Sequence, residues 1–97
     1  MSANGIKILY STHALQRMFS RSITQEEIKN CLKNGVVIAE YPNDTPYPSK
    51  LLSLSSHQRT IHIVTAYNSE ENNHIIITTY VPNPDLWNED FTSRRKK

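Results

Sequence analysis

Four β-prone runs in the second half of the chain constrain its fold more than any other feature. The runs are residues 36–41, 50–54, 60–67 and 74–81. The segment 42–48 between the first two holds three prolines, and it predicts a loop because each proline lacks a backbone donor and restricts the residue before it. The last run contains Ile75-Ile76-Ile77, which is apolar on both faces of a strand and therefore predicts a central strand.

Two helices are expected ahead of these runs. Residues 12–21 carry apolar side chains at spacings of three and four, which is the pattern of one helix face. These side chains are Ala14, Leu15, Met18 and Phe19. The second helix, residues 25–34, begins at a capping box of Thr24 and Glu27 and ends before Gly35.

The remaining segments complete the predicted architecture. Residues 6–10 are short and β-prone, which predicts an edge strand. Residues 85–91 predict a short C-terminal helix, with Trp87 and Phe91 one turn apart and packing inward. A chain of 97 residues suits one domain, residues 1–97. The expected fold class is α+β, with two N-terminal helices packed on a small antiparallel β-sheet.

Basic residues gather at the two ends of the chain. The formal net charge is only +2, yet residues 1–21 carry three bases and no acid, residues 92–97 carry four bases, and all nine acids lie within 22–91. If both ends meet in the fold, they form a positive patch that favours a polyanion such as RNA. The alternative is that the basic tail, residues 92–97, is a solvated and mobile terminus.

Several classes of protein are excluded by composition. A lone cysteine, Cys31, cannot form an internal disulfide and fits a reducing compartment. The start does not read as a signal peptide, and no segment approaches the roughly 20 apolar residues that span a bilayer, so a cytoplasmic protein without a membrane partner is expected. Two glycines leave no glycine-rich phosphate loop. The histidines and Cys31 lack the local spacings of zinc ligands, so neither a metal nor a cofactor is expected.

The first candidate site lies on the helix predicted over residues 12–21. His13, Arg17 and Arg21 recur every four residues and therefore lie along one stripe of the helix. Cations in a row suit phosphate oxygens, and arginine can bind phosphate in a bidentate manner. The alternative is a solvated basic face, or ion pairs with nearby glutamates.

The second candidate site lies on the predicted strands. His62 sits within an apolar run and points the opposite way from Ile61 and Ile63. It is either a general base or a hydrogen-bonded structural histidine. Tyr80 lies at the end of the last run, where it either supplies a proton and orients a phosphate or simply packs with its hydroxyl at the surface.

Together these features resemble a known family over residues 9–95. The residues that carry the resemblance are His13-Ala14, Arg17-Met18, Arg21, Ile23-Thr24, Gly35, Pro48, His62-Ile63-Val64, Ile77-Thr78-Thr79-Tyr80, Pro82, Trp87 and Arg94-Arg95. The chain resembles a family of small uncharacterised bacterial proteins grouped with the RelE/ParE-like toxin superfamily.

The resemblance implies the toxin component of a type II toxin–antitoxin system. Such a toxin pairs with a cognate antitoxin, often of a zinc-finger type in this family, and cleaves mRNA as a metal-independent endoribonuclease. The ribose 2′-hydroxyl attacks the adjacent phosphorus, a base removes its proton, and cations stabilise the phosphate. His62 would be the base or acid and His13 or Tyr80 its complement. The phosphate would be held by Arg17, Arg21, Arg94 and Arg95.

Two other functions are compatible with the same residues. One is a binding module that grips RNA or a protein without chemistry, and the other is a ParE-like inhibitor of DNA gyrase. The sequence leaves open whether the chain forms a homodimer.

Overall fold

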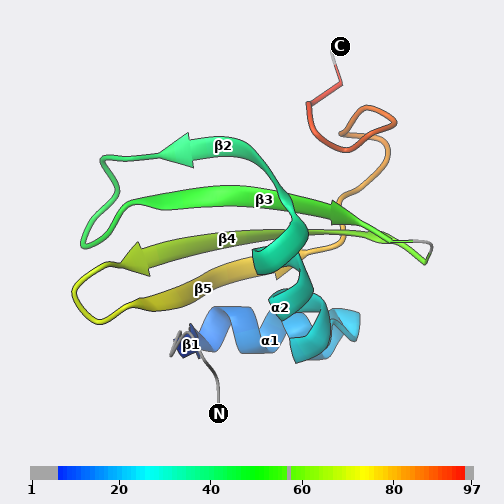
Figure 1. The fold of residues 1–97 in the computed structure, drawn as a ribbon. Helices are drawn as coiled ribbons and strands as arrows, with labels where there is room; N and C mark the ends of the chain where they lie inside the picture. Colours follow the sequence, from blue (N-terminus) through cyan, green and yellow to red (C-terminus); the bar gives the residue numbers. More distant parts are fainter. Residues whose placement is uncertain (1–6, 57, 96–97) are drawn as a thin grey trace.

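The structure, a computed structural model, describes residues 7–56 and 58–95. The predicted Ile6 of the edge strand and the tail residues Lys96 and Lys97 lie outside the described residues. Five strands and two helices follow one another along the chain (Figure 1). They are β1 (Lys7–Tyr10), α1 (Thr12–Arg21), α2 (Gln25–Asn34), β2 (Val36–Tyr41), β3 (Ser49–Ser55), β4 (Thr60–Asn68) and β5 (Asn73–Tyr80).

All five strands form one sheet in the order β1-β5-β4-β3-β2. The pairs β2–β3, β3–β4 and β4–β5 are antiparallel, but β1 pairs parallel to β5, with Leu9 opposite Ile75. The expectation of two helices on a small antiparallel sheet was therefore wrong. The molecule is mostly a five-stranded mixed sheet, and its two helices are short. The periodicity of a sequence identifies a strand but not the strand with which it pairs. Here the first strand of the chain pairs with the last, and that pairing is parallel.

Ser11 fixes the junction between β1 and α1. Its Oγ accepts the N-cap hydrogen bond from the amide of Ala14 at 2.9 Å and donates to the carbonyl of Ile77 at 2.8 Å. Its own amide donates to the carbonyl of Ile76 at 3.0 Å. Ser11 therefore caps the first helix and also extends the pairing of β1 with β5. Both roles supply hydrogen-bond partners to backbone groups that would otherwise lack them.

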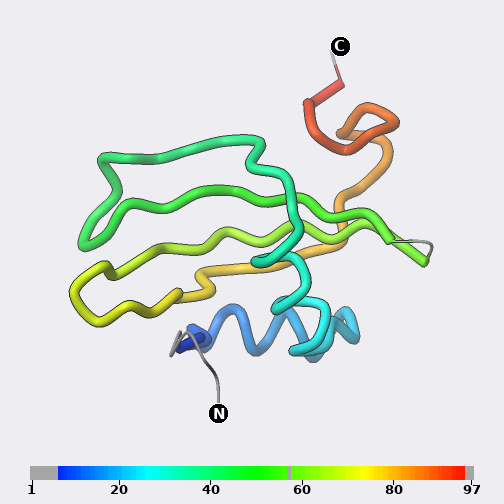
Figure 2. Tube along the Cα trace, viewed as in Figure 1, coloured from blue at the N-terminus to red at the C-terminus, as the bar shows by residue number. Residues whose placement is uncertain are grey.

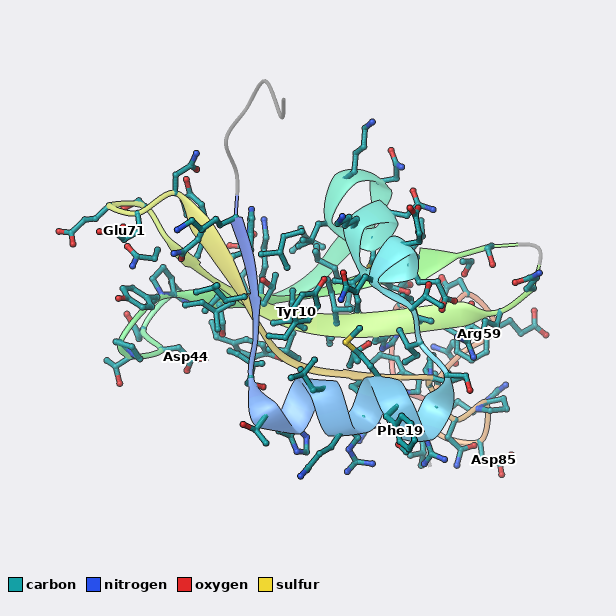
Figure 3. All side chains as sticks on the ribbon, turned by 90° about the horizontal axis from the view of Figure 1, so that it is seen from below. Tyr10, Phe19, Asp44, Arg59, Glu71 and Asp85 are labelled. Atoms are coloured by element: carbon teal, nitrogen blue, oxygen red, sulfur yellow. The ribbon has the colours of Figure 1, made fainter. Side chains whose placement is uncertain are left out.

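Both helices pack on one face of the sheet and bury a single core. The two predicted helix spans are confirmed, and both hydrogen bonds of the Thr24–Glu27 capping box are present. The core joins Ala14, Met18, Ile23, Ile28 and Cys31 to Leu52, Ile61, Ile63 and Ile76 of the sheet. The predicted apolar face of α1 is split, however, because Leu15 is 49% and Phe19 is 90% exposed. Phe19, labelled in Figure 3, lies on the outer side of α1.

The C-terminal segment, residues 82–95, is a closed loop rather than the predicted short helix over 85–91. Trp87 forms a β-bridge with Arg94, the amide of Asn88 donates to the carbonyl of Ser93 at 2.8 Å, and that of Arg95 donates to Leu86 at 2.9 Å. These cross-loop bonds use the backbone groups that a helix would need. Figure 2 shows the segment leaving the right-hand end of β5 and folding on the other side of the strands from α1.

In the part of the chain that the structure describes, neither helix has the length and apolar character needed to cross a membrane.

Candidate functional site

His62 lies on the sheet face opposite the two helices. Side chains alternate along a strand, so Ile61 and Ile63 of β4 enter the helix-side core and His62 points the other way. Its side chain is 0% exposed because the C-terminal segment covers it. The indole ring of Trp87 meets the imidazole edge-on, with ring centroids 4.5 Å apart and planes at 89°.

The hydrogen bonds of His62 define which nitrogen carries the proton. Nε2 lies 2.8 Å from the carbonyl oxygen of Phe91, and a carbonyl only accepts, so Nε2 is the donor. Nδ1 lies 3.3 Å from the hydroxyl of Tyr80 and is left to accept from it. Burial lowers the pKa of His62, against a smaller opposing effect of the Phe91 carbonyl. The ring is therefore neutral at pH 7, in keeping with this tautomer.

Tyr80 connects this buried histidine to the surface. It lies directly across from His62 in the pairing of β4 with β5, and the two rings have centroids 5.2 Å apart. Burial raises the pKa of Tyr80, Tyr41 raises it further, and Arg94 lowers it. The phenol is therefore protonated at neutral pH and can donate to Nδ1 of His62.

The other side of Tyr80 faces a cavity of about 570 Å³, which we call the aromatic groove. It lies between the β2–β3 side of the sheet and the C-terminal segment. Its lining is Ile38, Ala39, Tyr41, Leu51, Tyr80, Trp87, Thr92, Ser93 and Arg94. Arg94 is the one charged residue in this lining, and its guanidinium carbon lies 5.2 Å from the centre of the Trp87 ring. Aromatic rings beside an arginine can stack on planar groups and bind an anion.

A β-bulge brings Tyr41 into the groove. Val37 lies opposite Leu52, whose side chain is in the helix-side core, but Ala39 lies opposite Leu51 and Tyr41 opposite Ser49. The register shift between Val37 and Ala39 therefore moves the end of β2 to the other face. Simple alternation would have placed Tyr41 on the helix side, which is why sequence reasoning did not single it out.

The structure brings three of the predicted site residues together and leaves three apart. His62, Tyr80 and Arg94 meet at the aromatic groove and beneath it. His13, Arg17 and Arg21 are exposed on α1, which lies below β5 in Figure 1, whereas the C-terminal segment lies above the arrowhead of β3. The expected shared cleft of His62 and the α1 arginines is not formed, because His62 faces away from the helices.

Arg95 holds the C-terminal segment rather than lining the groove. Its Nε donates to the carbonyl of Pro84 at 2.7 Å, and its amide donates to Leu86. Besides Tyr41, sequence reasoning missed Trp87 and the carbonyl of Phe91 as components of the site. Trp87 had been singled out for packing alone, and no pattern in the sequence marks a backbone carbonyl as a partner of His62.

A family model described as a domain of unknown function, DUF4258, matches residues 10–81. No curated protein and no solved structure matches the chain. The matched residues include His62 and Tyr80 and end before the C-terminal segment, so the Trp87 and Arg94 side of the groove lies outside the match.

Proposed function

This chain belongs to the DUF4258 family of domains of unknown function, and we propose that it binds RNA in the aromatic groove and cleaves it as a metal-independent endoribonuclease. The proposal follows the resemblance to toxins at the level of activity only. The sheet is mixed rather than antiparallel as that resemblance implied, so the aromatic groove is the basis of the proposal.

The groove lining suits an unpaired RNA strand. Single-stranded RNA is recognised mainly by stacking its splayed bases on aromatic side chains or on arginine. Tyr41, Tyr80 and Trp87 supply rings, and Arg94 supplies a cation for a phosphate. None of the described residues that line the groove is acidic, so none of them repels that phosphate. The exposed Arg17 and Arg21 are not among the lining residues of the groove, and their proposed role is long-range attraction of the polyanion.

The observation that carries the proposal is the hydrogen-bonded series Tyr80–His62–Phe91. A groove-facing hydroxyl, a base behind it and a group that orients the base form the arrangement used to activate hydroxyl groups. The 2′-hydroxyl proton would pass to the Tyr80 oxygen while the proton of Tyr80 passes to Nδ1 of His62. The Phe91 carbonyl would stabilise the imidazolium through Nε2–H.

The bond changes then balance without a further reactant. The 2′-oxygen forms a bond to phosphorus as the bond from phosphorus to the 5′-oxygen breaks. The proton returns from His62 through Tyr80 to the leaving 5′-oxygen. Arg94 would stabilise the charge that develops on the phosphate oxygens. The products are a 2′,3′-cyclic phosphate and a 5′-hydroxyl end.

A second candidate is RNA binding without chemistry, and the complete burial of His62 favours it. A buried ring with a lowered pKa is a weak proton acceptor, and both of its nitrogens already have partners. In this reading His62 fixes the orientation of Tyr80 and of the C-terminal segment, and the groove only stacks bases.

The biological setting that we propose is the toxin of a toxin–antitoxin pair, with an antitoxin as protein partner. This setting rests on the resemblance alone. Growth arrest on expression in a bacterial host, relieved by Tyr80→Phe, would support it. Inhibition of DNA supercoiling without RNA cleavage would instead identify the gyrase-directed alternative.

The deciding experiment incubates the purified protein with end-labelled single-stranded RNA in EDTA. We expect cleavage that leaves 2′,3′-cyclic phosphate ends, and no cleavage of the same strand made with deoxyribose. Tyr80→Phe should lower the rate at least about 100-fold, as removal of a general acid or base does. Tyr47→Phe is the matched control, because the Tyr47 hydroxyl accepts from Asn68 and lies outside the groove lining. Binding without cleavage would identify the protein as a binding module. The absence of both binding and cleavage would overturn the proposal.

A further inference from the structure

A second cavity lies on the other face of the sheet, beyond the area that the helices cover. Its volume is about 440 Å³, within the usual range for small-molecule sites. Its lining is Glu40, Pro42, Pro48, Ser49, Lys50, Thr65, Tyr67, Asn72 and His74. Thr65 lies opposite both Lys50 and Ile76, and Ile76 belongs to the helix-side core. This Lys50 cavity is therefore separated from the aromatic groove by the sheet itself.

Lys50 gives the cavity a half-buried cation. It lies across from Glu40 in the pairing of β2 with β3, and both line the cavity. Within residues 7–56 and 58–95, however, the one salt bridge is that of Arg59 with Glu27. The ammonium of Lys50 is thus not neutralised by a carboxylate at contact distance. A partly buried cation without a partner favours an anionic ligand.

His74 gives the cavity an unused hydrogen-bonding atom. Its Nδ1 is buried and has no hydrogen-bond partner among the residues that the structure describes, which is uncommon in folded proteins and calls for an explanation. The imidazole lies against the ring of Tyr67, with centroids 5.0 Å apart. The hydroxyl of Tyr67 donates to Oδ1 of Asn72 at 2.7 Å and so fixes that ring. Because Nδ1 has almost no accessible surface, a bound molecule with a polar ring atom would satisfy it once the imidazole turns toward the cavity, while the ring of that molecule contacts Tyr67.

We propose that the Lys50 cavity binds a small heteroaromatic carboxylate. The carboxylate pairs with Lys50, the planar ring contacts Tyr67 and the proline rings of Pro42 and Pro48, and a ring nitrogen or its proton bonds to Nδ1 of His74. This site is independent of RNA binding, since it lies on the opposite face of the sheet and shares no lining residue with the aromatic groove.

The electrostatics of the cavity agree with an anion as ligand. The pKa of His74 is lowered, first by burial and then by the positive charge of Lys50. The Lys50 ammonium is therefore near the imidazole, so that one ligand can contact both, and the neutral imidazole offers one donor and one acceptor.

The test is a titration of the ¹⁵N-labelled protein followed by NMR, with nicotinate as the probe. We expect saturable shifts of the amides of Lys50, Tyr67 and His74. Nicotinamide has the same ring without the charge, and acetate has the charge without the ring, so each should bind at least about tenfold more weakly. Equal binding of nicotinate and nicotinamide, or shifts spread over the whole protein, would overturn the proposal.

Variants separate the two polar contacts. Lys50→Gln should weaken nicotinate binding about tenfold, as expected for the loss of a charge-assisted contact, whereas Lys33→Gln on the exposed side of α2 should leave it unchanged. His74→Phe keeps a ring beside Tyr67 and should weaken nicotinate more than it weakens benzoate, which lacks the ring nitrogen. Unchanged binding by both variants would overturn the proposal, and the probe comparison on the unaltered protein decides it even if a variant does not fold. RNA cleavage should be unaffected by nicotinate.

Discussion

The hydroxyl of Tyr80 lies 3.3 Å from Nδ1 of His62 on the neighbouring strand, and the other nitrogen of that ring lies 2.8 Å from the Phe91 carbonyl. His62 therefore ties β5 to the C-terminal segment across the face of the sheet that carries no helix. This connection stabilises the fold whether or not the groove performs chemistry. Substitutions of His62 can therefore be tested separately for their effect on stability and their effect on activity.

Removal of the His62 ring should destabilise the protein. His62→Ala leaves a cavity beneath Trp87 and an unpaired Phe91 carbonyl, and we expect a loss of about 2–4 kcal/mol in the free energy of unfolding. Urea unfolding followed by circular dichroism measures it. His13→Ala, on the exposed side of α1, is the matched control and should change stability by less than about 0.5 kcal/mol. Equal effects of the two substitutions would contradict the buried position of His62.

Stability should fall as the pH drops through the titration range of histidine. The pKa values of His62 and His74 are both lowered from the ordinary value of 6.5, chiefly by burial. The unfolded chain then binds more protons than the folded protein below about pH 6.5, so the free energy of unfolding rises with pH there and levels off above it. Urea unfolding at several pH values between about 5 and about 8 measures this dependence of the free energy of unfolding on pH. The slope should shrink in His62→Gln, and an unchanged slope in both His62→Gln and His74→Gln would refute the assignment.

Arg59 should not be replaceable by lysine. Its guanidinium donates to both carboxylate oxygens of Glu27, at 2.7 and 3.0 Å, and to the carbonyls of Arg21 and Ser22 at the end of α1. Lysine cannot reproduce this planar set of bonds. Arg59→Lys should cost about 1–2 kcal/mol in the free energy of unfolding, less than a buried network because both side chains are partly solvated.

The control for Arg59→Lys is Lys33→Arg on α2, which is exposed and should be neutral. The Glu27 carboxylate adds a separate pH effect. Arg59 holds the pKa of Glu27 below its ordinary value of 4.5, so this contribution is present above about that pH and is lost on acidification. An unfolding free energy for Arg59→Lys equal to that of the unaltered protein would show that the four bonds add no net stability.

Gly35 should resist substitution for reasons of space rather than backbone freedom. Its φ of −71° and ψ of 163° are accessible to any residue. A Cβ at this position would lie 2.5 Å from the carbonyl oxygen of Cys31 and 3.2 Å from that of Ser53. Gly35→Ala should therefore destabilise by about 1–3 kcal/mol, as crowding in a packed region does. Thermal unfolding measures it, with Lys29→Ala on the exposed side of α2 as a reference.

Features that depend on nearby residues were predictable from the sequence. The spans of α1 and α2 follow from their caps, since Ser11 and Thr24 bond to amides three residues ahead. The four β-prone runs are strands, and β1 is an edge strand. Even within α1, however, the sequence could not tell which apolar residues are buried. Met18 is buried whereas Phe19 is almost fully exposed, because the sheet covers only part of the apolar stripe.

The candidate site was only partly predictable, for the same reason. His62, Tyr80 and Arg94 were chosen for their chemistry, but their meeting depends on the C-terminal segment folding back as a loop over the sheet. The sequence predicted a helix there because Trp87 and Phe91 are four residues apart. The observed loop leaves Phe91 with a φ of 59° and directs its carbonyl to His62, which no local pattern indicates.

The sequence by itself determined the helices, their caps and the strand segments, because hydrogen bonds and side-chain periodicity within a few residues decide these. The tertiary structure alone decided the parallel pairing of β1 with β5, the bulge that turns Tyr41 into the groove, and the burial of His62 beneath Trp87. Each of these depends on contacts between residues far apart in the chain, whose energies are fixed by the whole sheet and cannot be assigned to any local segment.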